Sequence, residues 1–163
     1  MSEGRVVWIL GLSGAGKTSV GTELRRRMRS PAFLLDGDAL REAMGNDLGH
    51  SLENRRLQAW RLARLGALLS RQGISVVCPN LGLFPEVRAW NRKNLKCYFE
   101  AYLRVPLEVL KSRDPKGIYR GNLNVAGVDL PFAEPEGTDL VLDNAEPLAS
   151  LAPLAERILE ALP

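Results

Sequence analysis

The octapeptide Gly11–Thr18, with the sequence GLSGAGKT, restricts the fold of this chain more than any other segment. It matches the pattern G-x-x-x-x-G-K-[ST] of a phosphate-binding loop, which functions between a buried strand and a helix. The apolar segment 5–10 precedes it and the amphipathic segment 17–29 follows it, so both flanks fit. We therefore expect this loop to bind a nucleoside triphosphate.

The residue types in the loop suit a phosphate chain and its metal ion. Glycines let backbone N–H groups surround the phosphates, and the following helix presents its positive end. Lys17 can bridge the β- and γ-phosphates, and the Thr18 hydroxyl can ligate Mg²⁺. We expect ATP and Mg²⁺ to bind, with ATP contacts from Gly11, Ser13, Gly14, Ala15, Gly16, Lys17, Thr18 and Ser19.

Short apolar runs alternate with longer amphipathic runs along the chain. The pattern predicts strands at 5–10, 32–35, 74–78, 97–105 and 140–142. It predicts helices at 17–29, 39–44, 54–72, 86–93, 107–112 and 148–162. This alternation indicates an α/β fold of the P-loop NTPase type: a three-layer sandwich in which helices cover both faces of a parallel five-stranded sheet.

Size and composition favour one soluble domain. A chain of 163 residues that is 45% hydrophobic and 25% charged suits a single kinase-sized domain, 1–163. Its longest apolar runs, such as Val6–Leu10, fall far short of the roughly 20 residues of a membrane span. Residues 1–5 lack a signal-peptide pattern. We expect a cytoplasmic protein with no membrane partner.

Charge and rare residues narrow the ligand. A net charge of +3 and an aromatic content of 6%, not interleaved with basic residues, give no reason to expect nucleic acid. A small anionic ligand fits equally well. The two cysteines, Cys78 and Cys97, are expected to be reduced and buried. The single histidine, His50, excludes a metal site built from several histidines.

Two carboxylates, Asp36 and Asp38, follow the second predicted strand. Such a pair often forms only a turn and a helix cap. At the carboxyl end of a strand beside a phosphate loop, however, one carboxylate can align the attacking hydroxyl and the other can hold Mg²⁺. We expect Lys17, Asp36 and Asp38 to be catalytic, with Thr18 and Asp36 at the metal, directly or through water.

At these motifs the sequence resembles the adenylylsulfate kinases, which phosphorylate the 3′-hydroxyl of adenosine 5′-phosphosulfate with ATP. The resemblance spans nearly the whole chain in one order. The matching segments are Gly11–Thr18, Leu34–Asp38, Arg41, Asn46–Gly49, Ser51, Arg55, Val105–Leu110, Arg113–Tyr119, Ala126–Asp129, Pro131–Pro135 and Leu140–Asp143.

The resemblance implies a role for each matching residue. Asp36 and Asp38 orient the acceptor hydroxyl and the Mg²⁺ shell, with Asp38 favoured as the base. Arg41 and Arg55 hold the acceptor's 5′ anionic group, a task that suits guanidinium geometry. Arg113 contacts the donor nucleotide at the start of a water-excluding lid, about residues 113–135.

Several positions depart from the family pattern. His50 and Val125 replace two phenylalanines that enclose the acceptor's adenine, and Gln58 replaces an asparagine. The lid is shortened between Tyr119 and Val125, and Gly82 replaces a serine that is phosphorylated in some members. The predicted acceptor contacts are Asp38, Arg41, His50, Arg55, Gln58, Asn80 and Val125.

The segment after the third strand resembles a branch whose members include kinases of cytidine diphosphoramidate, used in surface-polysaccharide modification. Arg88 and Arg92 are candidates for altered acceptor contacts, and Trp90 is either a base platform or a core residue. Adenosine 5′-phosphosulfate, as in sulfate assimilation, is the leading acceptor, and a cytidine nucleotide such as cytidine diphosphoramidate is second. A regulatory nucleotide-binding module without transfer is a third reading, and the family also suggests a homodimer.

Overall fold

The predicted parallel five-stranded sheet is confirmed by the computed structural model, which describes residues 2–114, 117–121, 124–145 and 151–163. The strands pair in the order β2-β3-β1-β4-β5, and every pairing is parallel. They are β1 (Val6–Leu10), β2 (Ala32–Leu34), β3 (Ser75–Asn80), β4 (Tyr98–Arg104) and β5 (Leu140–Asp143).

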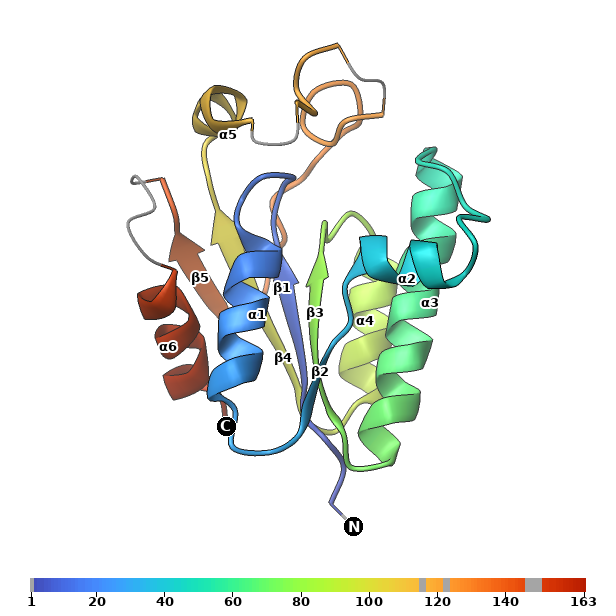
Figure 1. Cartoon of the computed structure of the whole chain (residues 1–163), viewed down its shortest axis with the longest axis vertical. Helices are drawn as coiled ribbons and strands as arrows, with labels where there is room; N and C mark the ends of the chain where they lie inside the picture. Colours follow the sequence, from blue (N-terminus) through green and yellow to red (C-terminus); the bar gives the residue numbers. More distant parts are fainter. Residues whose placement is uncertain (1, 115–116, 122–123, 146–150) are drawn as a thin grey trace.

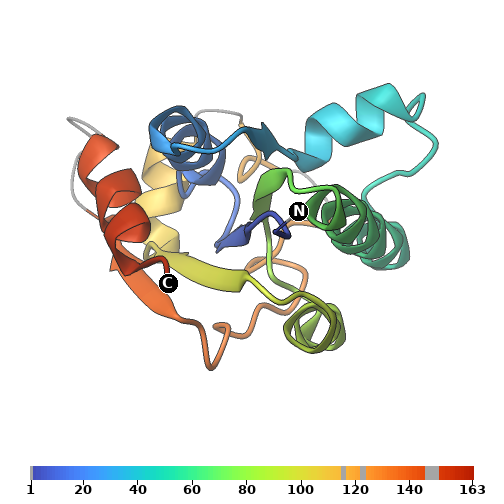
Figure 2. The same cartoon turned by 90° about the horizontal axis from the view of Figure 1, so that it is seen from below.

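Helices cover both faces of this sheet. Figure 2 shows α1 and α6 on one face and α3 and α4 on the other. Figure 1 shows the chain between α5 and β5 lying above the carboxyl ends of the strands. The helices are α1 (Lys17–Arg27), α2 (Gly37–Ala43), α3 (Leu52–Arg71), α4 (Pro85–Asn94), α5 (Leu107–Arg113) and α6 (Ala152–Ala161).

Strand β1 divides two hydrophobic cores because side chains alternate across a sheet. All its residues are buried. Val7 and Ile9 belong to a core shared with α1 and α6, whereas Val6, Trp8 and Leu10 belong to a core shared with α3 and α4. The strand that leads into the phosphate loop is therefore fixed on both faces.

Most predicted elements end within two or three residues of the observed ones. Helix α3 begins at Leu52, slightly before the expected start, because the Ser51 hydroxyl caps it by accepting from the Asn54 N–H at 3.2 Å. The expected start of the last helix lies outside the described residues. The expectation of two buried cysteines is wrong for Cys97, which is exposed in the turn before β4, whereas Cys78 is buried.

The predicted loop after α5 contains no helix or strand among its described residues, apart from an isolated bridge between Ala126 and Leu130. In the described part of the chain, no helix combines the length and the apolar character needed to cross a membrane.

Candidate active site

The phosphate loop joins β1 to α1, as its motif predicts. Gly14 and Gly16 adopt positive φ angles of 79° and 92°, which side chains disfavour. Gly11 lies so close to the neighbouring strand that a Cβ would be 2.7 Å from the Leu103 carbonyl oxygen. The Lys17 ammonium donates to the Leu12 carbonyl oxygen at 2.7 Å. Glycine is thus required at these positions by geometry as well as by phosphate chemistry.

The carboxylate of Asp36 connects the phosphate loop to α2. Its Oδ2 accepts from the Thr18 hydroxyl at 2.9 Å. Its Oδ1 caps α2 by accepting from the N–H groups of Asp38 and Ala39 at 2.9 and 3.2 Å. Asp36 is therefore the helix cap and also a neighbour of the loop, so the cap is confirmed and the catalytic role stays a prediction. Asp38 is exposed in the first turn of α2.

The hydroxyl oxygen of Thr18 and the carboxylate oxygen of Asp36 suit Mg²⁺, which prefers hard oxygen ligands and retains several waters. Among the described residues, no group of three or more His, Cys, Asp and Glu side chains could enclose a metal. A site for Mg²⁺ at Thr18 and Asp36 would thus take its remaining ligands from ATP and water.

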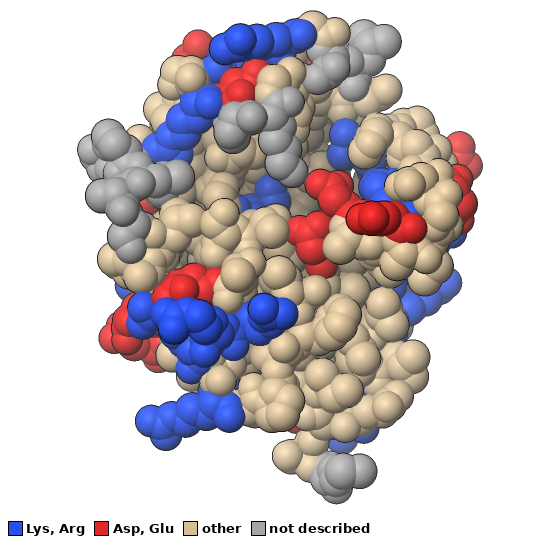
Figure 3. Space-filling view, viewed as in Figure 1, with Lys and Arg blue, Asp and Glu red and all other residues tan. Residues whose placement is uncertain are grey.

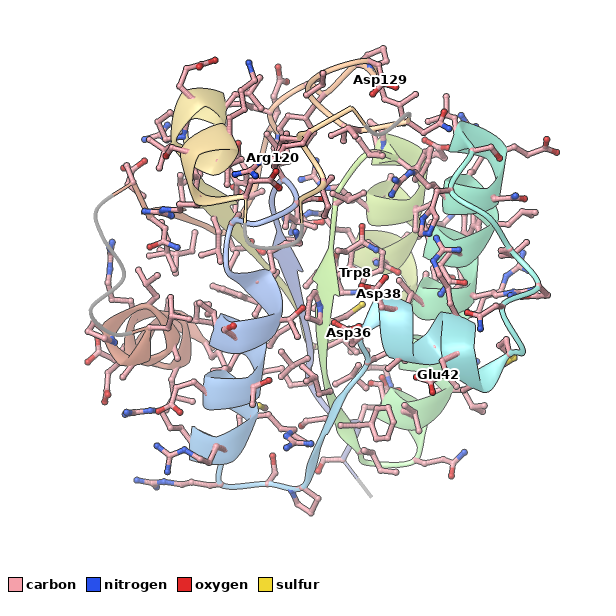
Figure 4. All side chains as sticks on the ribbon, turned by 45° about the horizontal axis from the view of Figure 1, so that its top comes forward. Trp8, Asp36, Asp38, Glu42, Arg120 and Asp129 are labelled. Atoms are coloured by element: carbon pink, nitrogen blue, oxygen red, sulfur yellow. The ribbon has the colours of Figure 1, made fainter. Side chains whose placement is uncertain are left out.

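Figure 3 shows a hollow between the lid side of the molecule and the α2–α3 side, with acidic and basic side chains on its wall. In Figure 4, Asp36 and Asp38 lie at the start of α2, and Arg120 and Asp129 lie on the lid across the opening. The carboxylate pair therefore lies on the α2 side of this opening, opposite the two labelled lid residues.

Arg41 and Arg55 both hold the loop between α2 and α3. Buried Arg41 donates from Nη1 to the carbonyl oxygens of Leu48 and Gly49, each at 3.1 Å. Arg55 donates from Nε to the His50 carbonyl oxygen and from Nη2 to the Asn124 carbonyl oxygen, both at 2.9 Å. Arg55 thus joins the loop between α2 and α3 to the lid.

His50 is exposed beside these two arginines. Partial desolvation and the charges of Arg41 and Arg55 lower the pKa of its imidazole, and Asp38 opposes the shift. Its pKa therefore lies below the usual value of 6.5, and the ring is neutral at pH 7.

Gln58 and Asn80 are already bonded to the backbone. Buried Gln58 donates from Nε2 to the Gly37 carbonyl oxygen at 3.0 Å, which ties α3 to α2. The Asn80 carboxamide oxygen accepts from the Gly82 N–H at 2.8 Å and closes the turn after β3. Both hydrogen bonds thus hold the backbone, and the contacts of these two residues with the acceptor stay a prediction.

Val125 lies in a closed turn of the lid. The Asp129 carboxylate accepts from the N–H groups of Asn124 and Val125. Val125 is only 4% exposed, so its side chain packs inside the turn, and its contact with the acceptor stays a prediction. A Cβ on Gly127 would lie 3.3 Å from Leu12, which shows how closely this turn packs on the phosphate loop.

Arg113 reaches the chain after β5 at the rim of the phosphate loop. Its guanidinium donates to the carbonyl oxygens of Asn144 and Ala145 at 2.8 and 2.9 Å. Asn144 in turn contacts the loop itself. The position is compatible with the expected contact to the donor nucleotide.

Arg88 and Arg92, the candidates for altered acceptor contacts, lie against a buried carboxylate on the α4 side. Arg88 donates to both oxygens of Glu100 at 3.1 and 2.6 Å, and Arg92 donates to Oε2 at 2.8 Å. Glu100 is fully buried, so this carboxylate must be paired. Trp90 packs edge-to-face on Trp60 at 5.9 Å, as a core residue does.

Two residues that bond the phosphate loop were not predicted from the sequence. The Tyr119 hydroxyl donates to the Ser13 carbonyl oxygen at 2.7 Å, and the Asn144 amide donates to the Ala15 carbonyl oxygen at 2.9 Å. Their sequence separations are 106 and 129 residues, so no local pattern indicates them.

A family profile described as "Adenylylsulphate kinase" matches residues 3–143. The chain belongs to the adenylylsulfate kinase family. It is therefore an adenylyl-sulfate-kinase-like phosphotransferase, and members of this family bind ATP.

Named relatives in the family differ in the acceptor. The chain is 36% identical over 148 residues to the cytidine diphosphoramidate kinase of Campylobacter jejuni, covering 86% of each chain. It is 36% identical over 146 residues to a probable adenylyl-sulfate kinase of Archaeoglobus fulgidus, covering 85% of this chain and 94% of the relative.

A solved structure of the family has the same fold. The Mycobacterium tuberculosis APS kinase CysC, in complex with AMPPNP and APS, superposes with a TM-score of 0.89 at 32% identity. The match covers 99% of this chain and 98% of that one. The family is thus established, and the acceptor of this chain is a separate question.

Proposed function

We propose that this protein is an ATP- and Mg²⁺-dependent kinase that phosphorylates the ribose 3′-hydroxyl of a small anionic nucleotide. Adenosine 5′-phosphosulfate is the leading acceptor, with ADP and 3′-phosphoadenosine 5′-phosphosulfate as products. The observation that carries the proposal is the 2.9 Å hydrogen bond between Thr18 and Asp36, which joins the phosphate loop to the carboxylate pair. We also propose that residues 1–163 form one kinase domain, because the described strands form one sheet.

The residues divide the work of phosphoryl transfer, which needs alignment and charge neutralisation more than covalent chemistry. Lys17 and the loop N–H groups neutralise the transferred phosphate. Thr18 and Asp36 would hold Mg²⁺, which would supply further charge neutralisation. Asp38 accepts the proton of the attacking hydroxyl.

The anionic end of the acceptor needs cations near the carboxylate pair. Arg41 and Arg55 supply them, since both approach the same loop from α2 and α3. The lid turn lies within hydrogen-bonding distance of Arg55, so it can close over the same ligand. Exclusion of water there favours transfer over hydrolysis of ATP.

Cytidine diphosphoramidate is a second candidate, supported by two residues. His50 keeps one exposed aromatic ring and Val125 is buried and aliphatic, so the pair of phenylalanines that encloses adenine is absent. Stacking on an aromatic side chain contributes about 1–3 kcal/mol per base, and its loss removes a preference for adenine. The Campylobacter jejuni relative is named for this acceptor.

The test is a direct comparison of acceptors. Purified protein with Mg-ATP is given each nucleotide in turn, ADP release is followed, and the phosphorylated position is located by NMR. We expect ADP release well above the no-acceptor background with one of the two nucleotides, and none with Lys17→Ala. Equal background rates with every nucleotide, despite ATP binding, would support the regulatory module instead.

A further inference from the structure

We infer that Tyr119 is a positioning residue for ATP: its hydroxyl bond to the Ser13 carbonyl sets the direction of the Gly14 N–H in the phosphate loop. The inference rests on the ATP-binding part of the proposed function and not on the identity of the acceptor. It concerns the link between the lid, which carries Tyr119, and the loop, which carries Ser13.

The link acts through one peptide group. The Ser13 carbonyl and the Gly14 N–H belong to the same planar trans unit and point in opposite directions. The Tyr119 hydroxyl donates to that carbonyl oxygen at 2.7 Å. A bond that fixes the oxygen on one side therefore fixes the N–H on the other.

The loop needs such a constraint because glycine imposes little of its own. Gly14 and Gly16 have positive φ angles, and glycine without a Cβ rotates among several backbone conformations at low cost. Phosphate binding depends on N–H groups that converge on one point. Peptide groups flanked by glycine must therefore be oriented from outside the loop.

Asn144 orients the peptide group between Ala15 and Gly16 in the same manner. Its Nδ2 donates to the Ala15 carbonyl oxygen at 2.9 Å, which fixes the Gly16 N–H. The Asn144 N–H donates to the Arg104 carbonyl oxygen at 3.0 Å, and the Asn144 carbonyl oxygen accepts from the Arg113 guanidinium at 2.8 Å. The loop is thus bonded from the end of β5 and from the lid.

Tyr119 is well placed to act as a constant donor. Its N–H donates to the buried Asp114 carboxylate at 3.3 Å, which anchors the start of the lid. Desolvation, with the nearby Asp114, raises the pKa of the Tyr119 hydroxyl to about 12. The hydroxyl therefore keeps its proton, and the bond to Ser13, throughout the neutral pH range.

The test compares Tyr119→Phe with Tyr98→Phe. The Tyr98 hydroxyl donates to Glu100 Oε1, also at 2.7 Å, on the α4 side and away from the loop. Each variant loses a hydroxyl bond of 2.7 Å, and Tyr98→Phe also loses the bond that the Tyr98 oxygen accepts from Asn91 Nδ2 at 3.3 Å. Affinity for AMPPNP is measured by calorimetry without acceptor, at a temperature well below both unfolding midpoints.

We expect Tyr119→Phe to weaken AMPPNP binding about three- to tenfold, the equivalent of one net hydrogen bond, and Tyr98→Phe to leave it unchanged. The KM for ATP rises by the same factor, and the KM for the acceptor stays within twofold. An AMPPNP affinity within twofold of the wild type for Tyr119→Phe, or an equal loss in both variants, overturns the inference. Because AMPPNP binding needs no acceptor, a wrong acceptor assignment does not affect this result.

Discussion

At the scale of single residues, we expect Asp36 and Asp38 to have different roles. Asp36 uses both carboxylate oxygens, on Thr18 and on the start of α2. In Asp36→Asn we expect the helix to stay capped, because Asn caps as well as Asp. The loss of charge raises the Mg²⁺ concentration for half-maximal rate about 10- to 100-fold. Activity titrated with Mg²⁺ measures this, and an unchanged midpoint would remove Asp36 from the metal shell.

Asp38 is the candidate base, and its replacement tests proton transfer alone. We expect Asp38→Asn to lower kcat by about 10²- to 10⁴-fold while leaving the KM for ATP unchanged. Glu42→Gln, on the same helix and exposed, is the matched control and retains the wild-type rate. Steady-state kinetics of the three proteins decide, and a nearly normal kcat in Asp38→Asn would exclude it as the base.

We expect acceptor binding to depend on pH because of the His50 imidazole. Desolvation and two arginines lower its pKa, so the ring is neutral at pH 7 and gains a proton only below the usual value of 6.5. An anionic acceptor beside it favours the protonated ring. Acceptor affinity should therefore rise as pH falls through the lowered pKa. His50→Gln should abolish the rise, which calorimetric titrations with the acceptor at several pH values measure. The same slope in both proteins would assign the effect to another group.

At the scale of elements, two glycines within helices give opposite predictions. In α1, a Cβ on Gly21 would meet Leu34 at 3.1 Å and Val77 at 3.2 Å. In α3, a Cβ on Gly66 would meet only Val6 at 3.8 Å, an ordinary contact. We expect Gly21→Ala to destabilise by about 1–3 kcal/mol through overpacking. Gly66→Ala should stabilise by about 0.4–1 kcal/mol through reduced chain entropy. Urea unfolding measures both, and the same sign in the two variants would contradict this account.

The elements could be predicted from the sequence because their signals are local. Buried β1 appears as an apolar run, and the loop after it has glycine where φ is positive. The cap of α3 is less visible, since Ser51 is one polar residue among several before the apolar pattern starts. The burial of Val125 could not be predicted, because it depends on how the lid turn closes around Asp129.

At the scale of the whole molecule, Glu100 is the most buried charged residue in the described part of the chain, and Arg88 and Arg92 enclose its carboxylate. Arg88→Met removes two charge-assisted bonds and leaves the buried carboxylate with Arg92 and the Tyr98 hydroxyl, so it should cost about 2–3 kcal/mol. Arg104→Met breaks an exposed pair with Asp143 and should cost at most about 1 kcal/mol. Urea unfolding of the two variants tests the difference, and equal costs would mean that water reaches Glu100.

Contacts between residues far apart in the sequence explain which part of the site could not be predicted. Its motifs located Lys17, Asp36 and Arg55 near one another, because each follows a strand or lies on a neighbouring helix. Tyr119 and Asn144 reach the loop only through tertiary structure. Glu100 did offer a signal, since a carboxylate within an apolar strand needs buried partners.

The placement of the tryptophans has a practical consequence. Trp8 lies in the core between the sheet and the helices α3 and α4, and half-buried Trp60 and Trp90 pack against the same core. Their intrinsic fluorescence therefore reports on one half of the molecule and is silent about the layer formed by α1 and α6. Overlapping fluorescence and far-ultraviolet circular dichroism transitions would show that both halves unfold cooperatively. A later fluorescence transition would reveal that the layer carrying the phosphate-loop helix melts first.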